Sequence, residues 1–315
     1  MKTSGLLFSS SEWQDVADVR TVRQAIALFE TVGMPSRNLS ARTRAEYSRD
    51  LCELAAFLEA RGASRLAVVS LAHLQGYQAW MDSAGFVSST RRRKTHTAKS
   101  FFRFLHDHGA TASHLAERLI PPKAPRKEPR FLSEEEFRAL LRACSHQPRD
   151  AALIELFLQT GLRLAEVARL RTTDLELPGR VTAGPDSVGL VHVVRKGGKQ
   201  DSVPLNFKAC RALKTWLAVR PASPSAHDAL FTSKFGRQLS KRAIQALVAK
   251  YLAEAGIHGA SVHSLRHTMA THHIARGTDL KTVQETLGHA SLATTALYVS
   301  LAKQAQRKAL QEHAL

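Results

Sequence analysis

The chain has 315 residues and a formal net charge of +18, from 45 Lys and Arg residues against 27 Asp and Glu residues. This length favours about two domains, and a basic surplus of this size indicates a polyanionic partner. No apolar run reaches the roughly 18 residues of a membrane-spanning helix. The three cysteines are too widely spaced for a disulfide framework or a thiolate metal site, so we expect a cytoplasmic protein without a membrane partner.

The first third of the chain predicts a helical domain over residues 18–118. Apolar side chains fall on one face of the segment 43–60, and Gly62 follows it as a stop signal. Two further helical segments are expected at 71–84 and 89–109. No alternation typical of strands appears in this region, so the unit is expected to be all helical.

The third of these helices begins with four consecutive cations. The helix dipole disfavours cations at this end, and a bound phosphate would neutralise them, although a solvated face is the alternative. We therefore expect DNA contacts from this helix, from the basic stretch that follows it and from one lysine of a later hairpin. The expected DNA-binding residues are Arg91, Arg92, Arg93, Lys94, Lys99, Arg126, Lys127 and Lys199.

A proline-rich stretch separates the two halves of the chain. Its four prolines remove backbone donors and disfavour helix, so residues 119–130 are expected to form an extended linker. Residues 131–315 predict a second, mainly helical domain, whose first helix opens with a capping box at Ser133. Alternating residues on either side of Gly197 predict a β-hairpin over 190–205, preceded by a loop insert. The predicted fold class is mainly α with a small β-sheet insert.

Several polar residues of the second domain have ordinary explanations when each is taken alone. Arg163 could pair with Glu166 three residues on, and Tyr298 could be a core tyrosine with a satisfied hydroxyl. Together they supply two guanidinium forks for phosphate oxygens, histidines and a lysine for proton transfer, and a phenol as nucleophile. The candidate catalytic residues are Arg163, Lys196, His263, Arg266, His289 and Tyr298, with Glu166 supporting them.

Three segments then carry a family resemblance. Residues 263–272, 287–291 and 294–298 read HSLRHTMATH, LGHAS and TTALY. They resemble the signature of the tyrosine recombinases, also called the phage integrase family, and the TGLR and KGGK segments at 160–163 and 196–199 match its earlier boxes. The N-terminal half, with Tyr47, Asp50-Leu51 and Ser100-Phe101-Phe102, is similar to the core-binding domain of bacterial Xer-type members.

The resemblance implies a mechanism without metal, ATP or another cofactor. Arg163, Arg266 and His289 would bind the scissile phosphate of double-stranded DNA. Tyr298 would attack it to form a 3′-phosphotyrosyl link, with His263 as the candidate base. Lys196, or Lys199 as the alternative, would protonate the leaving 5′ oxygen. A homotetramer on two DNA duplexes is implied, in which the tail after residue 298 could dock on a neighbouring subunit.

Three other readings stay open. A metal hydrolase would use His263 and His267, four residues apart on a helix, but Ser264 stands where such an enzyme needs a glutamate. A DNA-binding regulator would also be basic, yet it would have no need of the six candidate catalytic residues. A relaxing topoisomerase would share the chemistry and differ in not exchanging strands.

Overall fold

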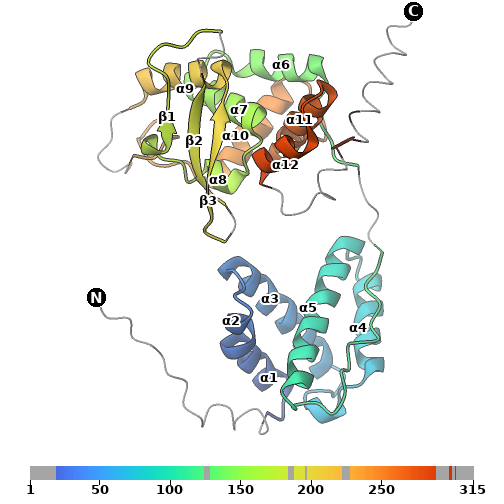
Figure 1. Ribbon diagram of the computed structural model, residues 1–315. Coiled ribbons are helices and arrows are strands. Elements are labelled where there is room, and N and C mark those ends of the chain that lie inside the picture. The colour runs from blue at the N-terminus through green and yellow to red at the C-terminus, as the bar shows by residue number, and fades with distance from the viewer. Residues whose placement is uncertain are drawn as a thin grey trace, which may run out of the picture. The chain divides into compact units, whose positions relative to one another are not determined.

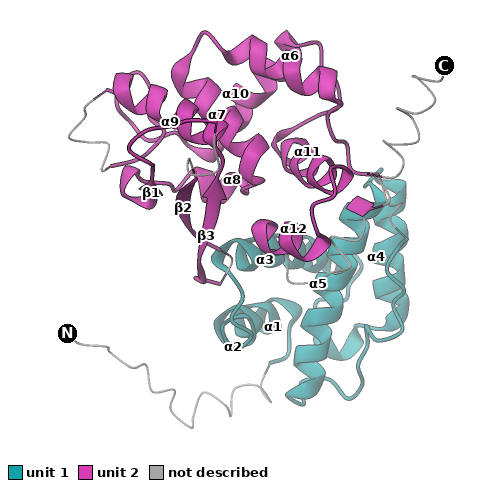
Figure 2. Cartoon of the chain, turned by 45° about the horizontal axis from the view of Figure 1, so that its top comes forward, with its two compact units in different colours: residues 1–127 teal, residues 128–315 magenta. Residues whose placement is uncertain are grey.

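The computed structural model describes residues 19–123, 128–183, 188–195, 197–221, 228–288, 298–299 and 302. The chain divides into two compact units, residues 1–127 and 128–315, each with its own apolar core (Figure 2). The division falls inside the stretch 119–130 for which the sequence predicts a linker. Arg126 and Lys127 of that stretch lie outside the described residues.

The regular elements of unit 1 among its described residues are all helices, in agreement with the expectation for this half of the chain, and one isolated β-bridge joins Thr21 to Arg65. Its elements are α1 (Val22–Leu28), a π-helical turn (Phe29–Gly33), α2 (Met34–Ser36), α3 (Ala41–Glu59), a 3-10 turn (Leu66–Val68), α4 (Leu71–Ser83) and α5 (Ser88–Asp107) (Figure 1).

The elements between residues 22 and 36 were not predicted, and Gly33 explains how they pack. A Cβ at Gly33 would lie less than 3 Å from the rings of Phe29 and Phe104, so the absent side chain allows the turn to approach α5 closely. Phe29 in turn packs edge-on against Phe101, with 5.7 Å between the ring centroids.

Unit 2 combines helices with a small antiparallel sheet of order β1-β2-β3 (Figure 1). Its elements are α6 (Glu134–Cys144), α7 (Pro148–Thr160), α8 (Leu164–Val167), a 3-10 turn (Thr172–Asp174), β1 (Leu175–Glu176), β2 (Gly189–Val194), β3 (Gln200–Leu205), α9 (Phe207–Val219), α10 (Lys241–Glu254), α11 (Val262–Ala275) and α12 (Leu280–Leu287).

The predicted hairpin is present, with Val191 paired to Val203. The expectation that the preceding connection is only a loop insert is wrong, because β1 pairs with β2 through Leu175 and Val191. A strand of two residues has no periodicity by which a sequence could announce it. The helix α9 was also not predicted. The fold class, mainly helical with a small sheet, is confirmed.

Helix α7 forms the centre of unit 2, where it contacts α6, α9, α11 and β3. It is buried on nearly all sides, as its apolar run from residue 151 to 158 predicts. The helix ends at Gly161, which adopts a left-handed conformation with φ 63°. The chain therefore turns sharply between α7 and α8, and this turn begins the site described below. Among the described helices, none combines the length and apolar composition needed to span a membrane.

Candidate active site

Arg266 lies at the centre of the candidate site, on the buried face of α11. Its guanidinium donates to the carbonyl oxygens of Gly161 (2.5 Å) and Leu287 (2.6 Å), and thereby joins the end of α7 to the end of α12. No carboxylate of the described residues forms an ion pair with it. Burial, together with the nearby Arg163 guanidinium, lowers the pKa of Arg266 to about 10.

Arg163 stands beside Arg266 at the start of α8, immediately after the turn at Gly161. Glu166 accepts hydrogen bonds from the Arg163 backbone N–H (2.7 Å) and from its Nη1 (3.0 Å). The other guanidinium nitrogen, Nη2, donates to the carbonyl oxygen of Gly288 at 3.1 Å. Glu166 is buried, so it orients Arg163 from behind, and the Arg163 side chain stays 36% exposed.

A third guanidinium, which sequence reasoning missed, completes the cluster. Arg195 follows β2 and is buried, and its Nη1 lies 3.3 Å from the same Glu166 carboxylate. Its Nε donates to Asp201 at 3.0 Å. The alternation along β2 could have identified it, because Val191 and Val193 are buried and Arg195 continues the same parity.

Tyr298 is buried, and its hydroxyl lies 2.9 Å from Nδ1 of His267 on α11. Burial raises the pKa of the Tyr298 phenol, while the positive Arg266 and Arg163 act in the opposite direction. The structure therefore brings the predicted nucleophile to the two predicted guanidiniums. Its neighbour His267 was considered in the sequence only as a metal ligand.

The imidazole of His267 is a weak base in these surroundings. Burial, reinforced by the neighbouring His263 and Arg266, lowers the pKa of His267 to about 4. The imidazole is neutral at pH 7 and can accept or donate a hydrogen bond, depending on its tautomer. His263, the expected base, lies one helical turn before His267 and is exposed.

Two other tyrosines are buried, and their surroundings differ from those of Tyr298. Tyr251 donates to Asp150 at 2.9 Å, and Tyr77 donates to Glu53 at 2.9 Å. Burial and these carboxylates both raise the pKa of each phenol. Arg93 acts in the opposite direction at Tyr77, but there the hydroxyl is held by a carboxylate. At Tyr298 two guanidiniums favour the phenolate, and its hydroxyl lies beside an imidazole, which is an environment suited to a nucleophile.

Two expected catalytic residues, Lys196 and His289, lie outside the described residues. Their neighbours in the chain are described: Arg195 precedes Lys196, and Gly288 precedes His289. Gly288 has a left-handed conformation with φ 61°, and a Cβ there would lie 2.9 Å from Nε of Arg195. The described residues that precede them, Arg195 and Gly288, thus lie in contact with each other.

Three of the four cations that open α5 have acidic partners within unit 1, which corrects the reason given for their DNA contact. Lys94 is buried and pairs with Asp50 (3.2 Å) and Glu53 (2.8 Å). Arg93 also pairs with Asp50, and Arg91 pairs with Asp82. Carboxylates from α3 and α4 thus supply the neutralisation that the sequence assigned to phosphate, and DNA contact by Lys94 is contradicted by its burial.

The remaining expected DNA contacts have mixed surroundings. Lys99 donates to the carbonyl oxygens of Glu117 (2.7 Å) and Leu119 (2.8 Å), so it fastens the segment after α5 to that helix. Arg92 and Lys199 are exposed, and so is Arg93 despite its ion pair with Asp50. These residues retain the accessibility that contact with a phosphate backbone requires.

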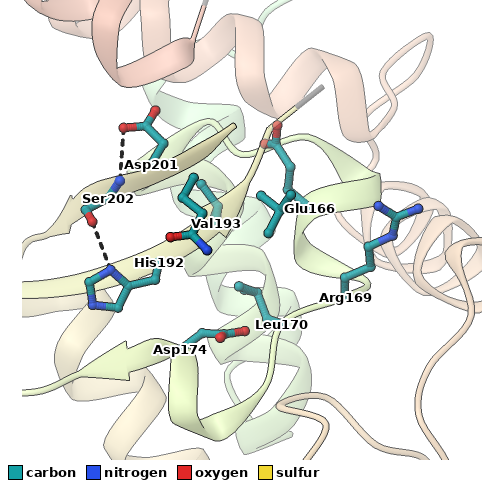
Figure 3. A pocket seen from close by; sticks show the side chains of 10 residues that line it. Glu166, Arg169, Leu170, Asp174, His192, Val193, Asp201 and Ser202 are labelled. Atoms are coloured by element: carbon teal, nitrogen blue, oxygen red, sulfur yellow. Dashed lines mark hydrogen bonds between the residues drawn. The ribbon is translucent and has the colours of Figure 1, made fainter. Parts of the chain in front are cut away.

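A pocket of about 460 Å³ lies next to the cluster, between α8 and the sheet (Figure 3). Glu166, Asp174 and Asp201 are among its lining residues, and His192 lines it too, with Nδ1 2.8 Å from the Ser202 hydroxyl. Arg169 also lines the pocket, but three carboxylates against one arginine make it less suited to an anion than the phosphate site expected at the arginines.

The metal-hydrolase reading gains nothing from the geometry. A search of the described residues finds no group of three or more His, Cys, Asp or Glu side chains arranged to hold a metal ion. His272 and His273 are occupied otherwise: Nε2 of His272 lies 2.9 Å from the Leu132 carbonyl oxygen, and Nδ1 of His273 lies 3.3 Å from the Thr278 hydroxyl.

Comparison with known proteins agrees with this geometry. The phage integrase family model matches residues 130–305, and the model of the phage integrase N-terminal SAM-like domain matches residues 29–109. Tyrosine recombinase XerC of Xanthomonas campestris pv. campestris (strain B100) is 36% identical over 269 residues, which cover 84% of this chain and 80% of the relative. Tyrosine recombinase XerD of Vibrio cholerae serotype O1 is 32% identical over 286 residues, 88% of this chain and 91% of the relative.

Solved structures share the fold at lower identity. The post-cleavage complex of the XerH site-specific recombinase with a palindromic difH substrate has a TM-score of 0.73 at 22% identity, covering 97% of this chain and 89% of that one. A lambda integrase dimer bound to a COC′ core site has a TM-score of 0.71 at 16% identity, covering 94% and 82%. From its two domain matches and its close relatives, the chain belongs to the phage integrase family of tyrosine recombinases.

Proposed function

We propose that this chain cuts and rejoins duplex DNA at a specific site through a 3′-phosphotyrosyl bond to Tyr298, and exchanges strands by way of a Holliday junction. The observation that carries the proposal is the position of the Tyr298 hydroxyl, buried beside His267 and close enough to Arg266 and Arg163 for their charge to favour its phenolate. A phenol in such surroundings is suited to attack an anionic ester that the same guanidiniums bind.

The two arginines hold the non-bridging oxygens of the scissile phosphate. Arg163 is half exposed, with one face held by Glu166, and so presents its remaining donors to a ligand. Arg266 adds positive charge from the buried side. Both interactions strengthen as negative charge accumulates in the five-coordinate transition state, which is where binding accelerates the chemical step. His289 adds a hydrogen bond at the same oxygens.

Proton transfer accompanies the exchange of phosphorus–oxygen bonds. The bond to Tyr298 forms, the bond to the 5′ oxygen breaks, and a proton passes from the phenol to a base while another reaches the leaving oxygen. His267 is too weak a base, because burial lowers the pKa of its imidazole to about 4 while it raises the pKa of the Tyr298 phenol above the ordinary value. His263 is the proposed base, and Lys196, with Lys199 as the alternative, is the proposed acid.

The assembly that we propose is a homotetramer on two DNA duplexes. Lambda integrase, which shares the fold, has been solved as a tetramer bound to a Holliday junction. Cations of both units are the proposed contacts to the DNA backbone, and the buried Lys94 is excluded from them. Arg92, Arg93 and Lys199 are exposed, and Arg126 and Lys127, which lie outside the described residues, are proposed from the sequence.

A covalent trapping experiment tests the proposal. The protein is incubated in EDTA, without nucleotide, with fragmented DNA of the organism that encodes it. Protein–DNA adducts are recovered under denaturing conditions, and their junctions are sequenced. A nicked duplex carrying the recovered site then serves as the substrate for variants. Wild-type protein is expected to form the adduct, and Tyr298→Phe is expected to bind the duplex without forming it.

Tyr251→Phe is the matched control, because Tyr251 is also a buried phenol but pairs with a carboxylate. It is expected to retain the adduct. An adduct that persists in Tyr298→Phe would overturn the assignment of the nucleophile, and an activity lost in EDTA would favour the metal-hydrolase reading.

A further inference from the structure

Arg195 makes more contacts than a hairpin residue needs. Its Nη2 donates to the Thr286 carbonyl oxygen at 2.7 Å, and its Nη1 donates to the Leu287 carbonyl oxygen at 3.3 Å. Nη1 also lies 3.3 Å from Glu166, and Nε lies 3.0 Å from Asp201. One guanidinium, with 6% of its side chain exposed, thus joins the β2–β3 hairpin to α8 and to the end of α12.

The C-terminal end of α12 is a place where a cation such as the Arg195 guanidinium is stabilising. The last carbonyls of a helix lack intrahelical partners and carry the negative end of its dipole, so cations stabilise them. Three consecutive carbonyls are involved: Arg195 binds those of Thr286 and Leu287, Arg266 also binds that of Leu287, and Arg163 binds that of Gly288. The three guanidiniums are therefore fastened to one turn of backbone.

Glu166 links Arg195 to Arg163 a second time. One carboxylate oxygen of Glu166 accepts from the Arg163 backbone N–H and from Arg195, and the other accepts from the Arg163 guanidinium. A charged partner on each side holds the carboxylate in one orientation. The orientation of the partly exposed Arg163 side chain therefore depends on a carboxylate that Arg195 holds in place.

The backbone at Gly288 is shaped around this residue. Its left-handed conformation brings the chain over the Arg195 guanidinium, where a Cβ would lie 2.9 Å from Nε and 3.0 Å from Cζ. The close approach needs a glycine. Two features thus make this contact possible: the burial of Arg195, and the absence of a side chain at Gly288 in the turn that covers it.

We propose that Arg195 is a positioning residue of the recombination reaction, which holds the Arg163 guanidinium in the orientation that receives a phosphate oxygen. It acts through Glu166 and through the terminal carbonyls of α12. This inference rests on the proposed role of Arg163 in binding the scissile phosphate. Arg195 itself does not touch the phosphate, so its effect is expected only where Arg163 is present.

A double-mutant cycle tests this dependence. The rate constant of covalent adduct formation is measured under single-turnover conditions on the nicked duplex for wild type, Arg195→Met, Arg163→Met and the double variant. Arg195→Met is expected to lower the rate constant about 100-fold, the order of loss that misplacement of a catalytic group causes. In the Arg163→Met background the same change is expected to cost less than about threefold, because the two residues act as one unit.

A neutral substrate separates positioning from general damage. A methylphosphonate at the scissile position lacks one negative oxygen, so it has less need of a guanidinium. The deficit of Arg195→Met is expected to shrink to less than about 10-fold on this substrate. Arg195→Lys, which keeps the charge but cannot reach four acceptors, serves if the methionine variant fails to fold, and is expected to lose about 10-fold on the ordinary phosphate.

Arg138→Met is the matched control, since Arg138 pairs with Glu134 at 2.7 Å on the exposed surface of the same unit. It is expected to cleave like the wild type. A wild-type rate in Arg195→Met and Arg195→Lys, a full additional loss in the double variant, or an undiminished deficit on the methylphosphonate would each overturn the role assigned to Arg195. Failure of the proposed function itself looks different, because then the wild type forms no adduct.

Discussion

Two buried cations, Lys94 in unit 1 and Arg266 in unit 2, are equally inaccessible, at 5% exposure, and have opposite surroundings. Lys94 pairs with the carboxylates of Asp50 and Glu53, so its charge is neutralised within the fold. Arg266 donates to backbone carbonyls and lies close to a second guanidinium, that of Arg163. The first arrangement stabilises a domain, and the second leaves positive charge for a ligand.

The difference shows which buried cations indicate a binding site for an anion: those whose charge the fold does not neutralise. Burial of an unneutralised charge is costly, and folded proteins tolerate it mainly where a ligand supplies the missing charge. Among the described residues, Arg163 and Arg195 pair with two carboxylates, Glu166 and the partly exposed Asp201, and Arg266 pairs with neither. A phosphodiester would supply the missing negative charge.

The largest effect that follows from this comparison is expected for Arg266→Met. Loss of a buried guanidinium from an oxyanion site should lower the rate of adduct formation by about 1000-fold. The free energy of unfolding should change much less, because removal of an unneutralised charge offsets the two lost hydrogen bonds. Single-turnover cleavage and urea unfolding measure the two quantities. If Arg266→Met lost stability but cleaved at the wild-type rate when folded, Arg266 would have the structural role that is assigned here to Lys94.

For Lys94→Met we expect the opposite result: a large loss of stability and little change in activity. Breaking a buried ion pair by removing one partner costs about 3 kcal/mol of unfolding free energy, and cleavage by the folded fraction should stay at the wild-type rate. The neighbouring exposed Arg92→Met is the control, with a change within about 0.5 kcal/mol. A Lys94 variant of full stability but weakened DNA binding would restore Lys94 as a DNA contact.

A smaller effect is expected from pH. The pKa of His267 is about 4 in the folded protein, lowered by burial and then by His263 and Arg266, whereas the unfolded chain protonates near pH 6.5. Between these values the unfolded state binds more protons, so stability is complete above pH 6.5 and falls as the pH drops towards 4. After allowance for solvent screening we expect a loss of about 1 kcal/mol between pH 7.5 and 5.

His267→Gln isolates this contribution, since glutamine does not titrate. Urea unfolding at the two pH values should show a weaker pH dependence in the variant than in the wild type. His272 and His273, whose pKa values burial also lowers, account for the dependence that remains. An equal slope in variant and wild type would show that His267 keeps its ordinary pKa.

The sequence predicted those features that depend on local pattern. The hairpin between residues 190 and 205 followed from alternation around Gly197, and the capping box at Ser133 from its three following glutamates. The two-residue strand β1 has no such pattern. The partner of Lys94 could not be predicted, because Asp50 lies 44 residues away and reaches it only through the packing of α3 on α5.

The candidate site likewise contains residues that the sequence predicted and contacts that it could not predict. Arg163, Arg266 and Tyr298 were identified from their chemistry taken together and from the family resemblance, and the structure brings them together. Arg195 was not predicted, because arginines in hairpins are usually exposed to solvent. Its position two residues after the buried Val193 nevertheless indicated that it faces the core. The contact of His267 with Tyr298 joins residues 31 positions apart in the chain, which no local pattern encodes.

The central claim, that guanidiniums in excess of their carboxylates deliver a phosphate to Tyr298, is tested most directly by locating the covalent bond. The wild-type adduct is digested with protease and nuclease, and mass spectrometry identifies the residue that carries the nucleotide. The account predicts a phosphodiester on Tyr298. A nucleotide on Tyr251, Tyr77, Tyr47 or a residue of another type would contradict it.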